Sequence, residues 1–224
     1  MQARHEYKHS LNLGDYVVLR DRLKRTMRRD CHADSNGEYV VRSLYFDTPG
    51  DKALREKISG VDHREKFRIR RYVGVEDYLV LEKKSKVHGL CYKASVCLSG
   101  EELDRVQKGE LDWMVGDERA LVRELYLKMV HERLRPKTIV EYVREPYICE
   151  AGNVRVTFDR NVRTGLFSTD FLKDDLPLVR AGDEIVLLEV KYDRFIPEYV
   201  VRLLQLESRR ASACSKYALS RVYG

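Results

Sequence analysis

Paired cysteines are missing from this sequence. The 224 residues include five cysteines, which is an odd number, and none of them forms a CxxC pair. Disulfide scaffolds and cysteine-based zinc sites depend on such pairs. Free, reduced thiols are typical of cytosolic proteins. The pattern therefore argues against a disulfide scaffold or a zinc site, and it favours a cytoplasmic protein.

Long apolar runs are also missing. The longest, such as "IVLLEV", have the length of a strand, whereas a membrane-spanning helix needs about 20 apolar residues. The first ten residues, "MQARHEYKHS", are polar and lack the apolar core of a signal peptide. We expect neither a signal peptide nor a membrane segment.

The short motifs of common enzyme families are absent as well. The sequence contains no GxGxxG, no P-loop, no GxSxG and no HExxH. Its six histidines do not pair at the spacing of metal ligands. No repeat, linker or low-complexity segment divides the chain. A function must therefore be sought in the arrangement of other residues.

What the chain does have is a core and many charges of both signs. Hydrophobic residues make up 43% of the sequence and charged residues 35%. Lysine and arginine number 42 against 36 acidic residues, which gives a net charge of only +6. This composition predicts one folded domain over residues 1–224. Because the net charge is small, the positions of the charged residues must indicate the function.

Strand-like segments dominate the local patterns. Alternating or β-branched stretches predict strands at 5–9, 38–48, 63–72, 78–86, 91–98, 137–147, 153–162 and 184–193. Helical spacing or capping residues predict helices at 13–27, 51–57, from Ser99, at 117–134 and from Pro197. Short connections between successive strands favour antiparallel pairing. We therefore expect an α+β fold with an antiparallel sheet of eight strands and flanking helices.

Charged residues recur at alternate positions in these strands. In "EKFRIRRYVGVEDYLVLEKKSK" (65–86), Arg68 and Arg70 share one face of the first strand, because successive side chains alternate. Glu82, Lys84 and Lys86 share one face of the second. The same alternation places the following residues on charged faces: Glu6, Lys8, Lys93, Tyr142, Arg144, Arg155, Thr157, Asp159, Glu189 and Lys191.

Two explanations of the charged face remain open. It is either the solvated outer face of an antiparallel sheet, or the lining of a sheet that closes into a barrel. A lining rich in cations repels itself unless it binds a polyanion. Arginine fits phosphate oxygens with two parallel hydrogen bonds, and lysine supplies a point charge. The few carboxylates would hold a divalent metal ion on the phosphate chain.

The order of six segments resembles a known family. "VRSLYFDTP", "EKFRIRRY", "LEKKSK", "VRVTFDRNV", "LLEVKY" and "SKY" together resemble the VTC domain of bacterial polyphosphate polymerase-like proteins. That family belongs to the triphosphate tunnel metalloenzymes, or CYTH-like superfamily. The resemblance implies an eight-stranded antiparallel β-barrel that binds triphosphate or polyphosphate with Mn²⁺ or Mg²⁺.

The resemblance also implies roles for individual residues. Glu189 would be a metal ligand and catalytic, Glu6 a second metal ligand, and Lys216 a catalytic lysine near one tunnel mouth. The implied substrate ligands are Lys8, Arg68, Arg70, Lys84, Lys86, Lys93, Arg144, Arg155 and Lys191. In "LEKKSK", a shift of one residue would exchange the inward set for the outward set.

The expected reaction is transfer of the γ-phosphoryl group of ATP to a growing polyphosphate chain. Hydrolysis of inorganic or nucleoside triphosphate in the same tunnel is the alternative, and a non-catalytic polyanion-binding module is a second one. Nucleic acid is not the expected partner, because the basic face is not interleaved with aromatic residues for stacking. Some family members carry fused membrane segments, so a membrane partner protein is a further expectation. The sequence predicts no oligomeric state.

Overall fold

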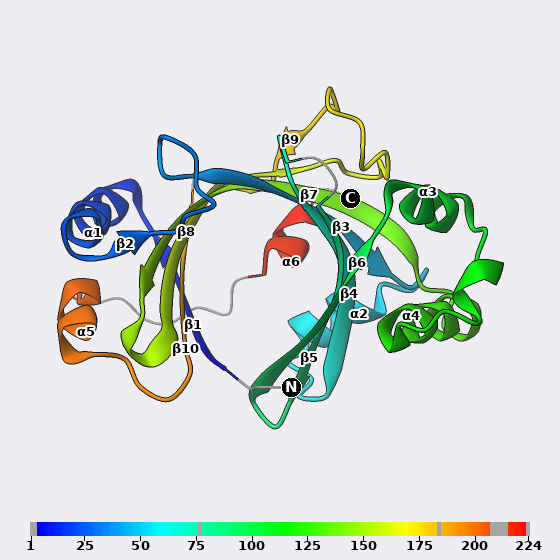
Figure 1. Ribbon diagram of the computed structural model, residues 1–224, viewed down its shortest axis with the longest axis horizontal. Helices are drawn as coiled ribbons and strands as arrows, with labels where there is room; N and C mark the ends of the chain where they lie inside the picture. Colours follow the sequence, from blue (N-terminus) through cyan, green and yellow to red (C-terminus); the bar gives the residue numbers. More distant parts are fainter. Residues whose placement is uncertain (1–3, 76–77, 183–184, 207–214, 223–224) are drawn as a thin grey trace.

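A single curled antiparallel sheet organises the computed structural model, which describes residues 4–75, 78–182, 185–206 and 215–222 (Figure 1). Its main path runs β1-β10-β8-β7-β3-β4-β5-β6. The strands of this path are β1 (His5–Leu11), β3 (Tyr39–Asp47), β4 (Arg64–Tyr72), β5 (Leu79–Val87), β6 (Leu90–Leu98), β7 (Arg135–Cys149), β8 (Val154–Thr164) and β10 (Val186–Tyr192). Two short strands, β2 (Arg28–Arg29) and β9 (Val179–Arg180), pair with β7 and β8.

The two ends of this path meet. Arg4, which precedes β1, forms an antiparallel bridge with Cys91 in β6. All pairs along the path are antiparallel. The expected eight-stranded antiparallel barrel of an α+β fold is therefore confirmed.

Helices cover the outside of the curl and one helix lies within it (Figure 1). The helices are α1 (Leu13–Thr26), α2 (Lys52–Ile58), α3 (Gly100–Lys108), α4 (Ala120–His131), α5 (Glu198–Leu204) and α6 (Lys216–Ser220), with 3-10 turns η1 (Asp112–Met114) and η2 (Ala151–Asn153). We call the sheet face covered by α1, α3, α4 and α5 the outer face, and the opposite one the inner face. No helix in the described part of the chain is long and apolar enough to cross a membrane.

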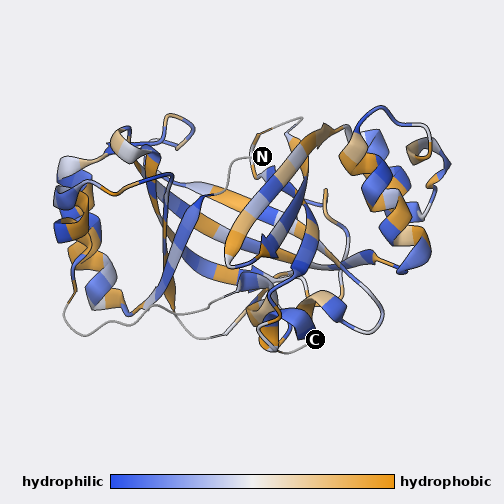
Figure 2. Cartoon of the chain, turned by 90° about the horizontal axis from the view of Figure 1, so that it is seen from below, coloured by the Kyte–Doolittle hydropathy of each residue, from blue (hydrophilic) through white to orange (hydrophobic). Residues whose placement is uncertain are grey.

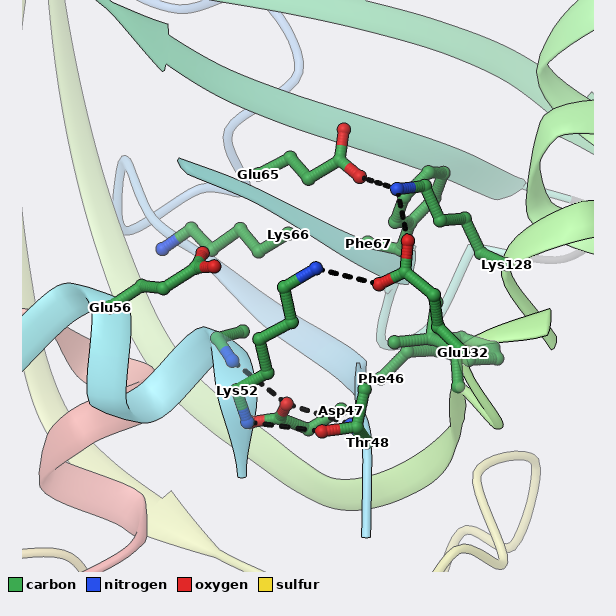
Figure 3. A pocket seen from close by; sticks show the side chains of 12 residues that line it. Phe46, Asp47, Thr48, Lys52, Glu56, Glu65, Lys66, Phe67, Lys128 and Glu132 are labelled. Carbon is green, nitrogen blue, oxygen red and sulfur yellow. Dashed lines mark hydrogen bonds and ion pairs between the residues drawn. The ribbon is translucent and has the colours of Figure 1, made fainter. Parts of the chain in front are cut away.

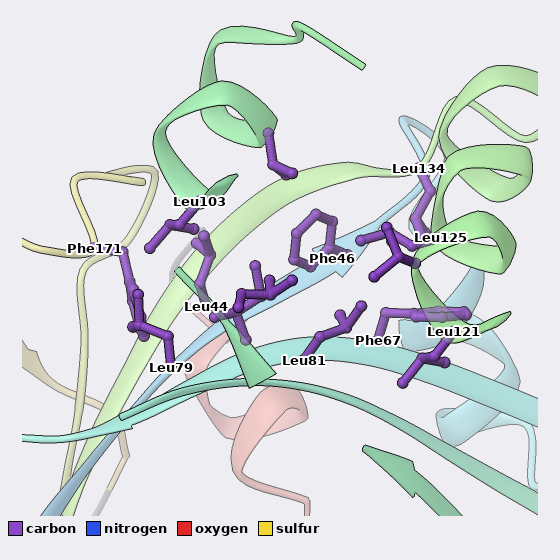
Figure 4. Close-up of a cluster of buried hydrophobic side chains, with 14 of the residues drawn as sticks. Leu44, Phe46, Phe67, Leu79, Leu81, Leu103, Leu121, Leu125, Leu134 and Phe171 are labelled. Atoms are coloured by element: carbon purple, nitrogen blue, oxygen red, sulfur yellow. The ribbon is translucent and has the colours of Figure 1, made fainter. Parts of the chain in front are cut away.

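Two apolar clusters hold the helices on the outer face. On one side, Leu44, Phe67 and Leu81 pack against Leu103 of α3 and Leu125 of α4 (Figure 4). On the other side, Leu19 and Leu23 of α1 pack with residues of β7, β8, β10 and α5. Figure 2 shows polar and apolar residues alternating along the strands. The period of two thus sends many apolar side chains to the outer helices and most charged ones inward, while a third apolar cluster, with Val41, Tyr142 and Tyr217, lies on the inner face.

Local sequence explains where several elements begin. Ser99 caps α3 with a complete capping box, since its side chain accepts from the Glu102 amide and Glu102 accepts from the Ser99 amide. Asn12 caps α1, since its Oδ1 accepts from the Asp15 amide. The helix predicted at 117–134 is shorter than expected. It begins after Arg119, whose backbone amide donates to the side chain of Asp117.

The described cysteines are free thiols, as expected, and Cys214 lies outside the described residues. The sequence patterns did not predict the short strands β2 and β9 or the short helix α6. Each of these elements depends on contacts with distant parts of the chain. For α6, the hydroxyl of Tyr217 donates to Asp47 at 2.5 Å, and Arg221 pairs with Asp51 at 2.9 Å.

Candidate functional site

The inner face of the barrel carries a dense set of ionisable side chains. Strand pairing places Lys8 beside Glu189, Arg68 beside Glu82, and Lys84 beside Lys93. The strand residues predicted from the sequence share this face, opposite the apolar clusters. Ionisable strand residues on the inner face include Glu6, Lys8, Lys66, Arg68, Arg70, Glu82, Lys84, Lys86, Lys93, Arg144, Arg155, Asp159, Glu189 and Lys191. Cations clearly outnumber carboxylates on it.

Glu189 is a buried carboxylate held by cations from three strands. Its Oε1 lies 3.2 Å from Lys191 Nζ and 3.6 Å from Lys8 Nζ, and its Oε2 lies 3.3 Å from Arg144 Nη2. Burial would raise the pKa of Glu189, but Lys191, Lys8 and Arg144 hold it well below its usual value. Glu189 is therefore ionised at neutral pH.

Asp159 joins the sheet to α6. Arg144 donates two parallel hydrogen bonds of 2.6 and 2.7 Å to this carboxylate, and Lys216 of α6 pairs with its Oδ2. The ammonium of Lys216 also lies over the ring of Tyr142, 4.6 Å from its centre. Burial lowers the pKa of Lys216, but Asp159 raises it above its ordinary value. Lys216 thus reaches the inner face as a protonated side chain.

Glu82 anchors a third cluster. It is fully buried and lies 2.6 Å from Arg68, 3.1 Å from Arg70 and 2.7 Å from Lys93. Burial would raise its pKa, whereas Arg68, Arg70 and Lys93 lower it far below its usual value. Arg68 Nη1 also donates to the hydroxyl of Tyr45 at 3.1 Å. The carboxylate holds these cations side by side. Its ion pairs do not use all the N–H donors of the two guanidinium groups.

Lys66 and Lys84 differ from these clusters because, in the described part of the chain, they form no ion pair with a carboxylate. They face each other across β4 and β5, and no carboxylate among the described residues pairs with either lysine or with Lys86. Burial lowers the pKa of Lys84 well below its ordinary value, and Lys191 and Arg68 lower it further, against a smaller opposing effect of Glu6 and Glu189. Burial also lowers the pKa of Lys66, and Lys8 and Arg68 add to this effect while Tyr45 and Glu6 oppose it. An anion between these lysines would relieve both effects.

Arg155 lies on the inner face but turns toward its rim. Its Nη2 donates at 2.6 Å to Asp30 and at 2.6 Å to the hydroxyl of Tyr39. Tyr39 in turn packs against Tyr72, with ring centres 4.9 Å apart. The sequence predicted the face of Arg155 but not these partners, since Asp30 precedes β3 and lies far from Arg155 along the chain.

The structure settles the register of β5 and adds residues that the sequence analysis passed over. Lys84 and Lys86 face inward, while Lys83 faces outward to Glu65 and Glu124. Lys66 was missed, although it shares the parity of Arg68 and could have been found by extending that alternation. The sequence pattern placed Glu82 and Asp159 on charged faces without indicating a role. Their ion pairs show that each carboxylate holds neighbouring cations in place.

A small pocket at the outer edge of the barrel is a separate feature (Figure 3). Lys66 also lines it, beside Glu56, but its other lysines are in ion pairs. Lys52 lies 2.8 Å from Glu132, and Lys128 contacts both Glu132, at 2.6 Å, and Glu65. Because Lys52 and Lys128 are neutralised by neighbouring acids, this pocket is a poor site for a polyanion.

Glu6 and Glu189 fit a divalent metal ion through their chemistry. Both carboxylates contact the same ammonium group, that of Lys8, so their oxygens converge on one cation position. Hard oxygen donors suit Mg²⁺ and Mn²⁺. The described residues offer no third carboxylate, histidine or cysteine close enough to complete a protein-only cluster there. Phosphate oxygens and water would supply the remaining ligands.

Comparison with known proteins identifies the family. The model of the VTC domain matches residues 3–222. The chain belongs to the VTC-domain family. Members of the triphosphate tunnel superfamily, to which VTC domains belong, generally use divalent metal ions. No curated protein sequence matches the chain.

Solved structures support the same fold for this VTC domain. A Bacillus halodurans protein provisionally assigned as an adenylate cyclase superposes with a TM-score of 0.53 at 15% identity, over 85% of this chain and 80% of that one. A Pyrococcus horikoshii protein superposes with a TM-score of 0.52 at 13% identity, over 96% of this chain and 98% of that one. At such identities, the likeness shows the fold alone, which is the triphosphate tunnel fold.

Proposed function

We propose that this VTC domain is a polyphosphate polymerase-like phosphotransferase that moves the γ-phosphoryl group of ATP to the end of a polyphosphate chain. The observation that carries the proposal is the excess of cations on the inner face, above all Lys66 and Lys84, which have no acidic partner in the described residues. Both lysines are half-buried, and a partly desolvated cation without an ion pair is costly. A chain of phosphates supplies an anionic group for each of these lysines.

The paired clusters would position the phosphate chain. Glu82 holds Arg68 and Arg70 next to each other, and Asp159 holds Arg144, so the guanidinium groups are oriented before substrate binds. Arginine hydrogen bonds to phosphate are charge-assisted and often bidentate. Fixing the donors in advance reduces the entropy lost on binding.

In the proposed reaction, a terminal oxygen of the acceptor chain forms a bond to the γ-phosphorus of ATP. The bond from that phosphorus to the β–γ bridging oxygen breaks, and ADP leaves with the electron pair. Such transfers require positioning and charge neutralisation more than a covalent nucleophile. Lys216 would supply positive charge rather than act as a base, because Asp159 keeps it protonated.

A divalent ion bound by Glu6 and Glu189 would neutralise charge on the phosphoryl oxygens. The chain's own residues set its position. Lys8 contacts both carboxylates, and Lys191 and Arg144 contact Glu189. These cations keep both carboxylates oriented toward the same region of the inner face.

Incubation with ATP and either Mn²⁺ or Mg²⁺ tests the proposal. ADP, inorganic phosphate and polyphosphate chain length are measured together. The proposal predicts ADP release with growth of polyphosphate. Release of phosphate without polymer would replace it with triphosphate hydrolysis. Tight triphosphate binding without turnover would replace it with a non-catalytic polyanion-binding module.

A further inference from the structure

Asp62, His63 and His88 form a cluster outside the inner-face network. Asp62 and His63 precede β4, and His88 lies in the turn between β5 and β6. One ligand atom from each residue lies within 4.8 Å of the other two. The sequence spacing of the histidines gave no sign of this, because the β5–β6 hairpin brings His88 to His63 only in the folded chain.

The distances within this cluster approach those of a metal site. Asp62 Oδ2 lies 3.5 Å from His88 Nδ1 and 4.0 Å from His63 Nε2. A tetrahedral ion with bonds of about 2.0–2.1 Å separates its ligand atoms by roughly 3.3–3.4 Å. Small side-chain rotations therefore suffice to bring the three atoms onto one ion.

The backbone holds the cluster in place without a metal. Asp62 Oδ2 accepts from the His88 amide at 2.8 Å, and Oδ1 accepts from the Gly89 amide at 2.9 Å. His88 and Gly89 both adopt left-handed backbone angles, with φ of 48° and 78°, as a tight hairpin turn requires. Hydrogen bonds of this kind orient metal-ligating carboxylates in known sites.

The electrostatic surroundings also distinguish this cluster from other acidic groups. No lysine or arginine among residues 4–75, 78–182, 185–206 and 215–222 pairs with Asp62. Asp30, in a second cluster with Cys31 and His32, is already held by Arg155. A metal ion can therefore bind Asp62 without displacing a cation, and the exposed imidazoles of His63 and His88 let it enter from solvent.

We propose that Asp62, His63 and His88 bind a late first-row divalent ion such as Zn²⁺, with water in the remaining position. Two imidazoles and one carboxylate suit Zn²⁺ and Cu²⁺ better than Mg²⁺, which prefers oxygen ligands. The site lies two residues beyond Lys86 on the same hairpin, close to the end of the inner-face network. It does not depend on which reaction the inner face performs.

Calorimetric titration of the untagged full chain with Zn²⁺ tests this site. Excess Mg²⁺ is present to occupy sites made of oxygen ligands alone. The expected result is one Zn²⁺ bound per chain, with binding weakened roughly 10–100-fold or more in His63→Ala and in His88→Asn, since each removes a ligand. Asparagine is chosen at His88 because it tolerates the left-handed conformation.

His32→Ala is the matched control, because it changes the second cluster and leaves Asp62, His63 and His88 intact. With Cu²⁺ as the probe, the electron paramagnetic resonance spectrum should show two nitrogen ligands in the wild type and in His32→Ala, and one in His63→Ala and in His88→Asn. Circular dichroism checks that the variants fold. The proposal is overturned if the wild type binds no Zn²⁺, if His63→Ala and His88→Asn bind it like the wild type, or if His32→Ala alone abolishes binding.

Discussion

Lys83 and Lys84 are neighbours in β5, but they lie on opposite faces of the sheet in opposite electrostatic surroundings. On the outer face, Lys83 Nζ lies 2.9 Å from Glu65 and also pairs with Glu124 of α4. Burial lowers the pKa of Lys83, but these carboxylates raise it above its usual value. On the inner face, Lys84 has no acidic partner among the described residues, and its pKa is lowered.

The same contrast holds for other charges of the two faces. Arg42 and Glu141 are buried on the outer face, where Arg42 Nε donates to Glu141 at 2.8 Å and Arg42 Nη1 donates to the Lys173 carbonyl at 2.6 Å. Glu145, also buried, accepts from the hydroxyls of Tyr16 and Tyr147. Buried charges with a structural role are paired and hydrogen-bonded. The inner face departs from this rule in one direction, toward extra positive charge, which indicates a site for an anion.

The largest expected effect is on catalysis, from Glu189→Gln. The substitution preserves shape and removes the charge that the proposed metal ion requires. We predict that turnover of ATP falls at least 100-fold, about 2.7 kcal/mol of barrier, while triphosphate still binds, since losing a negative charge does not repel an anion. ADP release is measured with Mn²⁺ and with Mg²⁺.

The matched control for Glu189 is Glu124→Gln on the outer face, which breaks an ion pair with Lys83 and touches no inner-face residue. It should turn over ATP like the wild type. Turnover in Glu189→Gln equal to that of the wild type would remove Glu189 from the proposed metal site.

Arg70 and Arg71 provide the next comparison, because they are adjacent in β4 and face opposite sides. Arg70→Ala should weaken triphosphate binding at least tenfold, about 1.4 kcal/mol, since it removes charge-assisted hydrogen bonds worth roughly 1.5–3 kcal/mol each. Arg71 pairs with Asp174 at 2.5 Å outside the barrel, so Arg71→Ala should bind triphosphate normally. Equal affinities of the two variants, measured by calorimetry, would contradict the role assigned to the inner face.

The smallest expected effect is on the number of protons taken up when an anion binds beside Lys84. The pKa of free Lys84 is lowered by burial and by Lys191 and Arg68, and a bound anion raises it. Between the free and bound pKa values, binding takes up protons, so affinity falls as pH rises through that window. Sulfate is a suitable probe because it does not titrate there.

Calorimetry in buffers of different ionisation enthalpy measures the proton uptake. Lys84→Arg should reduce it, because a guanidinium stays charged, whereas Lys83→Arg should leave it unchanged. Proton release on binding, or uptake equal in all three proteins, would be inconsistent with an unpaired Lys84.

The alternation within strands explains why so much of the inner face could be predicted. Arg68 and Arg70 share a face in any strand. The apolar residues that alternate with Glu189 and Lys191 along their strand show which face packs against the core. The register of β5 was open, because "LEKKSK" carries cations at both parities. It was resolved by Glu65 and Glu124, which draw Lys83 outward.

Contacts between distant segments could not be predicted in this way. Asp159 meets Lys216 only because α6 folds into the curl of the sheet. Arg155 meets Asp30, and His88 meets Asp62, through loops whose positions follow from strand pairing and barrel closure. A single sequence contains no periodic signal for such contacts, since they depend on register and closure together.

The most direct test of the central claim compares thermal unfolding of Lys84→Met and Lys83→Met with and without triphosphate. Without ligand, Lys84→Met should be at least as stable as the wild type, because it removes a half-buried cation that forms no ion pair with the described residues. Lys83→Met should lose about 0.2–1 kcal/mol with its ion pairs. Saturating triphosphate stabilises the wild type by mass action, and it should stabilise Lys83→Met equally and Lys84→Met less. If Lys84→Met is the less stable variant without ligand and gains as much from triphosphate as the wild type, the inner-face cations are structural and the account is wrong.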